Sequence, residues 1–289
     1  MWILIPVLTA FTAFAQSGPT HDLAFWRAIQ ANQFAVPARE SAPALARELS
    51  AHLGDTDPAW RDDVAFSTLE QWMSKGILPP DDIRPLMREW SANLKVGIGE
   101  TGTNAVLRRS FSALTLAAVV ARDNTAPFLS KAEFDGLFEA TLNYLAAERD
   151  LRGFDDTLGW MHSAAHTADL LRGLGRSRHL PLDGQARILT AVSEKLRNAT
   201  VVFDFGEDER FARALAILLT REDFSLDGFR DWLTIAAPPA PATPTVATLR
   251  SAQNMKNMLA KLGVLLARQP TLPTPAAAAR DAVLAAVRF

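Results

Sequence analysis

Hydrophobic residues return along most of this chain at intervals of three and four positions. Phe134, Leu137, Phe138, Leu142 and Leu145 follow this spacing. Because an α-helix completes one turn in 3.6 residues, these five side chains share one helical face. Residues 188–196 and 211–218 repeat the pattern, and no convincing run shows the period of two that marks a half-buried strand. The pattern predicts an all-α protein.

Prolines and helix-capping residues divide the pattern into pairs of helices. Expected helices start near residues 58, 80, 103, 130, 157, 182, 207 and 226. The first helices of successive pairs then start 45, 54 and 50 residues apart. HEAT and armadillo repeats, which are stacked helical hairpins, have periods of ~40–47 residues. We therefore predict a HEAT- or armadillo-like α–α superhelix.

The two ends of the chain differ from this central part. Residues 1–15 carry no charged side chain and end in Ala13-Phe14-Ala15, a small-x-small pattern typical of a cleaved secretory signal peptide. Cleavage before Gln16 predicts a periplasmic or secreted protein with no stable membrane span, because the run is shorter than the ~20 residues that a span needs. We expect a helical-repeat domain over 16–235, a proline-rich linker over 236–245 and a terminal helical pair over 246–289.

Charge and composition narrow the possible chemistry. Lys plus Arg number 30 and Asp plus Glu number 32, so the net charge of −2 provides no general field for nucleic acid, and we expect no nucleic-acid partner. The absence of Cys excludes disulfides, thiolate metal sites and Cys nucleophiles. A G-x-G-x-x-G motif at 97–102 follows an expected helix rather than a strand, so it favours a loop over a dinucleotide site.

The segment from Glu148 to Asp169, ERDLRGFDDTLGWMHSAAHTAD, contains the candidate site. In the helix expected from residue 157, His162, His166 and Asp169 project from one stripe. Two imidazoles and a carboxylate can bind Zn, Fe(II) or Mn, so a divalent transition metal is a candidate cofactor. The candidate binding residues are Arg109, Glu148, Arg149, Asp150, Arg152, Trp160, His162, His166, Asp169 and Glu207.

Each of these features also has a structural interpretation. Arg149 and Arg152 before Gly153 are typical of a helix C-terminus, where cations face the negative end of the dipole. A His pair in a packed helix commonly forms a hydrogen-bonded core network. Acidic residues at 207–209 suit the first turn of a helix. The segment is therefore a structural network, a metal site, or a ligand or proton-transfer site without metal.

A resemblance to a known family adds to this interpretation. Glu148-Arg149-Asp150-Leu151-Arg152-Gly153, then Gly159-Trp160, then His162-x-x-x-His166-x-x-Asp169, resembles the bacterial domain-of-unknown-function family numbered 2785. Supporting stretches are Asp57-Pro58 with Arg61-Asp62, Ile98-Gly99-Glu100, residues 109–114 and residues 207–210. The resemblance implies an all-helical fold and points to these polar residues, and it implies no activity.

Three functions are compatible with the sequence. The first is an exported helical-repeat binding module whose polar cluster serves an unknown small molecule or protein. The second is a metal-dependent hydrolase with His162, His166 and Asp169 as ligands and Glu148 or Asp150 as general base. The third is a purely structural scaffold. Convergence of the polar residues in a solvent-reachable cleft would favour the first two, and a sealed, fully paired network would favour the third.

Overall fold

The computed structural model describes residues 21–237 and 243–287. The expected signal peptide over 1–15 and its cleavage site before Gln16 lie outside the described residues, as do positions 238–242 of the expected linker. The helices are α1 (Leu23–Ala31), α2 (Ala42–Ala51), η1 (His52–Gly54), η2 (Ala59–Phe66), α3 (Ser67–Ser74), α4 (Pro80–Asn93), α5 (Ala105–Thr125), α6 (Lys131–Ala147), α7 (Ser163–Arg176), α8 (Leu182–Asn198), α9 (Glu207–Leu219), α10 (Leu226–Ala236), α11 (Val246–Ala267) and α12 (Thr274–Ala286).

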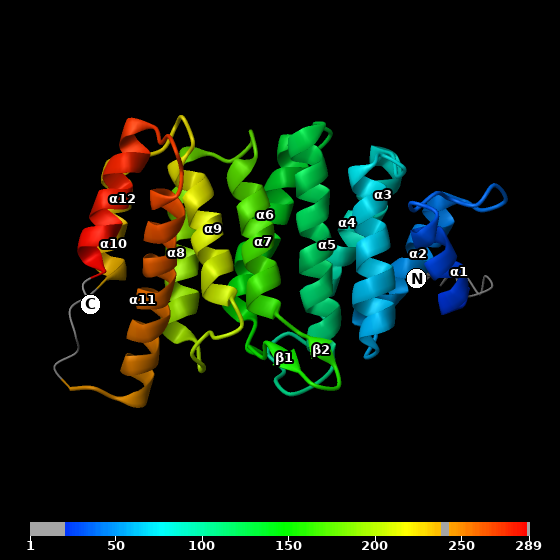
Figure 1. Ribbon diagram of the computed structural model, residues 1–289, viewed down its shortest axis with the longest axis horizontal. Coiled ribbons are helices and arrows are strands. Elements are labelled where there is room, and N and C mark those ends of the chain that lie inside the picture. Colours follow the sequence, from blue (N-terminus) through cyan, green and yellow to red (C-terminus); the bar gives the residue numbers. More distant parts are fainter. Residues whose placement is uncertain (1–20, 238–242, 288–289) are drawn as a thin grey trace, which may run out of the picture.

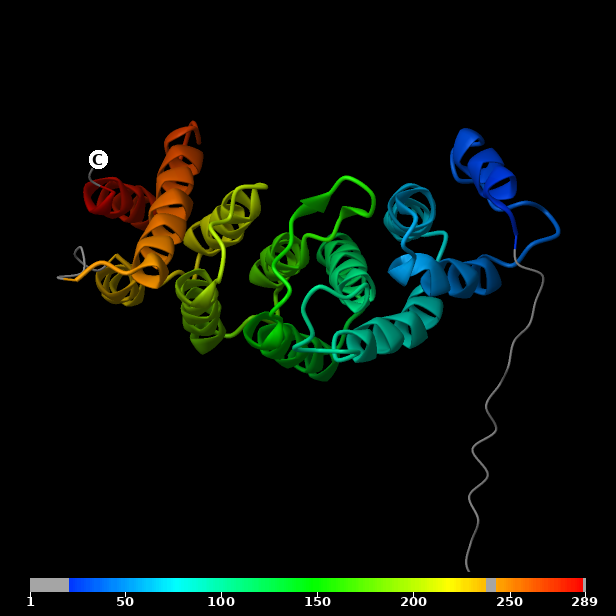
Figure 2. The same cartoon turned by 90° about the horizontal axis from the view of Figure 1, so that it is seen from below.

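The helices stand side by side and form two layers that bend into an arc (Figures 1 and 2). Helices α5, α7, α9 and α11 contact one another in series on the concave side, whereas α4, α6, α8 and α10 lie on the convex side. The hydrophobic core fills the space between the layers and runs along the whole arc. This architecture confirms the prediction of an all-α protein built from stacked helical hairpins.

Helix α6 shows how the sequence specifies these elements. Ser130 and Glu133 form a capping box at its start, which satisfies two backbone N–H groups that have no partner inside the helix. Phe134, Leu137 and Phe138 are buried, and burial of each such side chain is worth about 1.5–3 kcal/mol. Leu142 belongs to the same periodic face but is half-buried, because it lines a groove between α6 and α8.

Two predicted helix boundaries around the candidate site are wrong. The helix expected to start at residue 157 starts at Ser163, and a short hairpin of β1 (Phe154–Asp155) and β2 (Gly159–Trp160) precedes it. Asp155 makes the hairpin turn, because its Oδ1 atom accepts hydrogen bonds from the backbone N–H groups of Thr157 and Leu158. The helix expected to end near Arg152 ends at Ala147, and its last residues form an irregular segment instead.

The remaining boundaries lie close to those expected. The helix expected to start near residue 58 is present, although its first half, η2, has wide π-helical turns. Val201-Val202-Phe203, three consecutive apolar residues, lies in the loop after α8. Helix α11 packs on α8 and α9, and α12 packs on α10 and α11. Within the described ranges, no helix is both long and apolar enough to cross a membrane.

The irregular segments that connect successive helix pairs meet at one edge of the stack. The loop after α4 (residues 94–104), the segment between α6 and α7 (residues 148–162) and the loop before α9 (residues 199–206) all lie at the lower edge in Figure 1, where the hairpin projects. Loops in such a stack have few backbone partners of their own. Side chains must therefore hold them, and the candidate residues lie among them.

Candidate functional site

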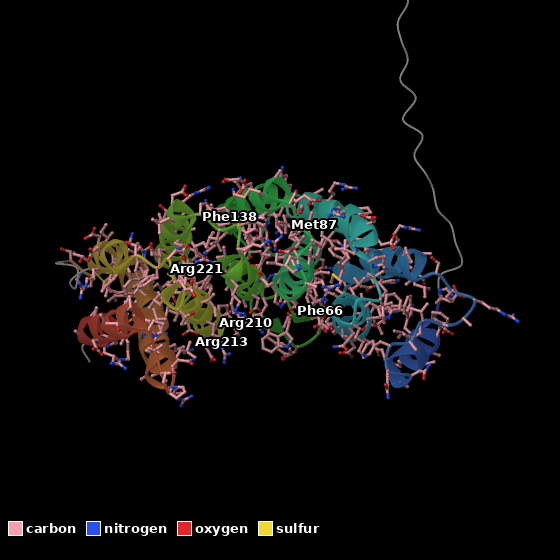
Figure 3. All side chains as sticks on the ribbon, turned by 90° about the horizontal axis from the view of Figure 1, so that it is seen from above. Phe66, Met87, Phe138, Arg210, Arg213 and Arg221 are labelled. Atoms are coloured by element: carbon pink, nitrogen blue, oxygen red, sulfur yellow. The ribbon has the colours of Figure 1, made fainter. Side chains whose placement is uncertain are left out.

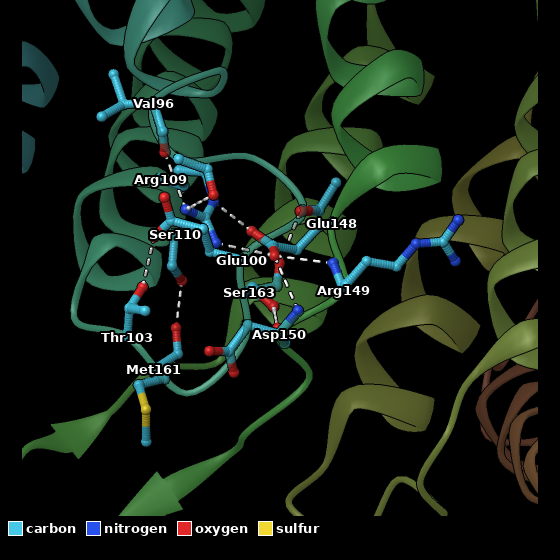
Figure 4. Close-up of polar contacts among 12 residues, drawn as sticks. Val96, Glu100, Thr103, Arg109, Ser110, Glu148, Arg149, Asp150, Met161 and Ser163 are labelled. Atoms are coloured by element: carbon cyan, nitrogen blue, oxygen red, sulfur yellow. Dashed lines mark hydrogen bonds and ion pairs between the residues drawn. The ribbon is translucent and has the colours of Figure 1, made fainter.

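Glu148 holds two of these loops together. It follows α6 directly and is 3% exposed. Its Oε2 atom accepts a hydrogen bond from Arg109 Nε at 2.6 Å, and its Oε1 atom accepts one from Arg109 Nη2 at 3.0 Å (Figure 4). Oε1 also accepts the backbone N–H groups of Arg149 and Asp150, both at 2.9 Å. The carboxylate is thus the hydrogen-bonding centre of this segment.

Arg109 extends the connection to the loop after α4. Its guanidinium group is fully buried, and Nη1 donates to the carbonyl oxygens of Val96 at 2.9 Å and Gly97 at 2.8 Å. Burial lowers the pKa of Arg109, but the hydrogen bond and the charge of Glu148 outweigh it and raise the pKa overall. A bidentate pair in such surroundings fixes geometry strongly, because either partner alone would be a buried, uncompensated charge.

Asp150 and Arg152 form a second pair beside the first. Arg152 donates from Nη2 to Asp150 Oδ2 at 2.6 Å and to the carbonyl oxygen of Thr103 at 2.7 Å. Gly102 donates its backbone N–H to the same Oδ2 at 2.9 Å. Burial raises the pKa of Asp150, but these hydrogen bonds from Arg152 and Gly102 outweigh it and hold the pKa below its ordinary value. The pair locks the 94–104 loop a second time.

His166 is buried at the end of the same network. The Ser110 hydroxyl donates to the carbonyl oxygen of Met161, so its hydrogen bond of 2.8 Å with His166 Nδ1 must be donated by the imidazole. Burial, with the nearby charge of Arg210, holds the pKa of His166 well below its usual range. The side chain is therefore a neutral imidazole that carries its proton on Nδ1.

His162 lies directly before α7 rather than within it. Its backbone has φ +46°, a left-handed conformation that is strained for a residue other than glycine. Its Nε2 atom donates to the carbonyl oxygen of Phe205 at 3.1 Å and lies 3.6 Å from Glu207 Oε1. Burial lowers the pKa of His162 to about 4 and is the main factor that raises the pKa of Glu207.

Asp169 does not join the two histidines. It forms an ion pair with Arg210 from α9, and Arg172 lies 4.0 Å from its carboxylate. Arg210 and Arg213 lie on the concave side of the arc (Figure 3), where Asp169 also lines a groove. Across the two described stretches, no group of three or more His, Asp or Glu side chains is arranged to hold a metal ion. The stripe expected from the sequence assumed that His162 was helical, and its position outside α7 removes that geometry.

Trp160 belongs to a different part of the site because it is exposed to solvent. Its ring stacks on His162 with centroids 4.2 Å apart, Phe154 contacts it at 4.7 Å and Phe205 at 6.2 Å. The exposed fractions of Phe154, Trp160 and Phe205 are 43%, 39% and 46%. We call these three residues the aromatic edge. His162, on which Trp160 stacks, donates to the carbonyl oxygen of Phe205, so the aromatic edge joins the hairpin to the loop before α9.

Sequence reasoning missed two cations that hold this structure. Arg61 was named only within a stretch that supports the family resemblance, yet it is fully buried and donates to the carbonyl oxygens of Leu158 at 2.7 Å and Trp160 at 3.3 Å, which anchors the hairpin. Lys195 donates to the carbonyl oxygen of Glu148 at 2.8 Å. The sequence could have indicated that Lys195 is buried, because it stands three residues after Val192, within the apolar stripe of α8.

The fold and the contacts among its loops define the class of protein. It is an α–α superhelix in which buried ion pairs join the loops between successive helix pairs. The chain belongs to the family described as protein of unknown function, DUF2785, which matches residues 94–266. That match contains all three loops and confirms the resemblance. No curated protein and no solved structure matches the chain.

Proposed function

We propose that this protein is an exported helical-repeat binding module and that the aromatic edge contacts a protein partner. One observation carries the proposal: the buried pairs of Arg109, Glu148 and Asp150 would by themselves suit a structural scaffold, but the aromatic side chains of the adjoining hairpin and loop remain in solvent. Arg109, Glu148 and Asp150 are at most 3% exposed, whereas Trp160 is 39% exposed. The buried charges therefore serve to hold a surface and are not themselves open to a substrate.

Physical chemistry supports a protein partner for this surface. Aromatic side chains supply large contact areas at low entropic cost and are enriched among the residues that dominate binding energy. Large contiguous patches of exposed apolar surface commonly mark interaction sites. Arg61 donates to the carbonyl oxygens of Leu158 and Trp160, which fixes the hairpin that presents Trp160. A surface held in one geometry loses little conformational entropy on binding.

The exported location rests on the sequence. An uncharged apolar start with Ala13-Phe14-Ala15 before Gln16 supports a cleaved signal and a periplasmic or secreted protein. A partner would then be met outside the cytoplasm. The motif pairs are also suited to this setting, because a chain without Cys gains no stability from disulfides there and must rely on packing and buried pairs.

Metal content discriminates the hydrolase from the binding module. His162 and His166 could each donate a neutral nitrogen, but Asp169 is engaged by Arg210. We expect protein purified without chelator to contain less than about 0.1 equivalent of any transition metal and to show no melting shift with Zn, Mn or Fe(II). A stoichiometric metal, or a melting shift that is lost in His166→Ala, would favour the hydrolase instead.

Site-specific photocrosslinking tests the binding surface. A benzoylphenylalanine at position 154 or 205, introduced in the native host, should give one shared adduct, identified by mass spectrometry. The same probe at Leu284, which is 48% exposed on α12, is the matched control and should not give it. Trp160→Ala should reduce the adduct from position 154. No shared adduct, or the same adduct from position 284, would refute the proposal and favour a purely structural scaffold.

A further inference from the structure

Arg149 has a position unlike those of the other charged residues at 148–152. Glu148 forms an ion pair with Arg109, and Asp150 forms one with Arg152. The Arg149 guanidinium is exposed, and among the residues that the structure describes it has no hydrogen-bond or ion-pair partner. In Figure 4 its side chain extends away from the network around Glu148. The motif thus contains one cation that the loop structure does not use.

Arg149 lines a groove between α6 and α8. The groove has a volume of about 860 Å³, within the ~300–1,000 Å³ that is usual for small-molecule sites. Apolar side chains line part of it, with Leu142 and Ala146 from α6, Ala191 from α8 and Val201 from the following loop, beside polar ones such as Asn143. This explains why Leu142 is only half-buried although it belongs to the periodic face of α6.

A second cation, Lys195, lies at the end of the same groove. Its side chain is 8% exposed, and Nζ donates to the carbonyl oxygen of Glu148 at 2.8 Å. An ammonium group has three donors, so two remain beyond this bond. The bond also covers the carbonyl end of α6, which would otherwise repel an anion. The charges that act on Lys195 are those of Glu148, which Arg109 already holds, and of Arg149.

The other charged residues of the groove are mostly engaged. Arg187 forms an ion pair with Glu139 at 2.6 Å, and Arg152 forms one with Asp150 at 2.6 Å. Glu194 also lines the groove, but it is exposed on α8 and stands one position, about 100° of helical rotation, from Lys195. The groove therefore combines partly apolar walls with two cations whose charge no side chain of the described chain takes up directly.

We propose that this groove binds an organic anion with an apolar body. The acid group lies between Arg149 and Lys195, where an arginine fork and a nearly buried ammonium can both donate to it. The apolar body lies along Leu142, Ala146 and Ala191. The proposal concerns the convex side of the stack and does not depend on the aromatic edge or on a protein partner.

A pair of fluorescent dyes tests the recognition of charge. The purified protein is titrated with 8-anilinonaphthalene-1-sulfonate, which has an apolar body and a sulfonate, and with N-phenyl-1-naphthylamine, which has the same rings without the acid. We expect one saturable site for the sulfonate and at least about tenfold weaker binding of the neutral dye, because hydrogen bonds to charged groups are the stronger ones. Equal affinity for the two dyes, or no saturable binding of the sulfonate, would overturn the proposal.

Matched variants place the site. Arg149→Gln removes an exposed cation that has no partner among the described residues, so the melting temperature should not change, while the affinity for the sulfonate should fall about tenfold or more. Arg88→Gln, on α4 and also exposed, is the control and should bind as the wild type does. Lys195→Met should weaken binding as well, whereas Lys195→Arg should retain most of it. An unchanged sulfonate affinity in Arg149→Gln would overturn the site.

Displacement of the bound sulfonate distinguishes the acids that could occupy it. Decanoate and decyl phosphate share a chain and differ in the acid, and decanol has no charge. We expect one or both acids to displace the dye and decanol to fail at the same concentration, and the better acid identifies the headgroup. Displacement by decanol as strong as that by the acids would overturn the proposal, because the groove would then select only for apolar surface.

Discussion

Replacing Glu148 by Gln tests whether the buried pair with Arg109 holds the edge of the stack. The substitution preserves shape but removes the charge that faces a fully buried guanidinium. It also replaces one of two acceptor oxygens by a donor, and all four groups that contact these oxygens are N–H donors. The variant therefore places donor against donor as well as leaving a charge unpaired.

The expected loss of folding stability in Glu148→Gln is large for a single isosteric substitution. Removing one partner of a buried ion pair costs about 3–5 kcal/mol, because the other charge stays buried without compensation. At about 2–4 °C per kcal/mol for chains of this size, the melting temperature should fall by on the order of 10 °C. The Arg109 guanidinium also holds the carbonyl groups of Val96 and Gly97, so the loop over 94–104 should loosen with it.

Two measurements check this together. Thermal unfolding followed by circular dichroism gives the global change, and amide hydrogen exchange reports on the loop, since a repeat stack can open locally before it unfolds. Asp135→Asn is the control, because its pair with Lys131 is about half exposed and such pairs contribute about 0–1 kcal/mol. If Glu148→Gln unfolds within about 1 °C of Asp135→Asn, or if protection over 94–104 is unchanged, the reasoning is wrong.

Three further predictions concern burial, packing and export. Folding lowers the pKa of His166 well below the ~6.5 of an unfolded chain, so the unfolded state takes up this proton first and stability should decrease as the pH falls below about 6.5. Chemical denaturation at several pH values should show a smaller decrease in the free energy of unfolding for His166→Asn. An equal dependence of stability on pH in the two proteins would contradict the prediction. A Cβ atom on Gly153 would lie 2.3 Å from Phe205 Cδ2, so Gly153→Ala should destabilise by about 1–3 kcal/mol in calorimetry. Gly136→Ala, in an open position within α6, should instead stabilise by roughly 0.5–1 kcal/mol, and a reversed order would refute the packing argument. N-terminal sequencing of the protein from its host should begin at Gln16, and intact Met1 in the cytoplasm would end the export hypothesis.

Much of the fold followed from local signals in the sequence. Ser130 starts a helix because its hydroxyl caps α6, and Leu182 and Glu207 start helices where proline and acidic residues indicated. The apolar face that includes Phe134 and Leu137 is buried where the helical period places it. These features depend on residues a few positions apart, so a single sequence contains them in full.

The candidate site could be found in the sequence but not assembled from it. The segment over 148–169 was unusual because charged and imidazole groups interrupt apolar helices, which burial penalises unless partners exist. Its internal shape was misjudged at His162, where tertiary contacts hold a left-handed backbone before α7. A hairpin with two-residue strands leaves almost no periodic signal, and the wrong helix start made a three-ligand stripe look available.

The sequence by itself determined the helices, their pairing and the presence of buried charge, because these follow from periodicity, capping and composition. Only the tertiary structure decided which charged side chains form ion pairs with each other. Arg109 and Glu148 are 39 positions apart, and Arg61 reaches the carbonyl of Leu158 across 97 positions. Such pairs depend on how neighbouring repeats stack, and the fact that Arg149 has no partner among the described residues becomes visible only once their contacts are known. Which charged side chains pair over long sequence distances is determined by the folded stack and cannot be deduced from the local sequence pattern.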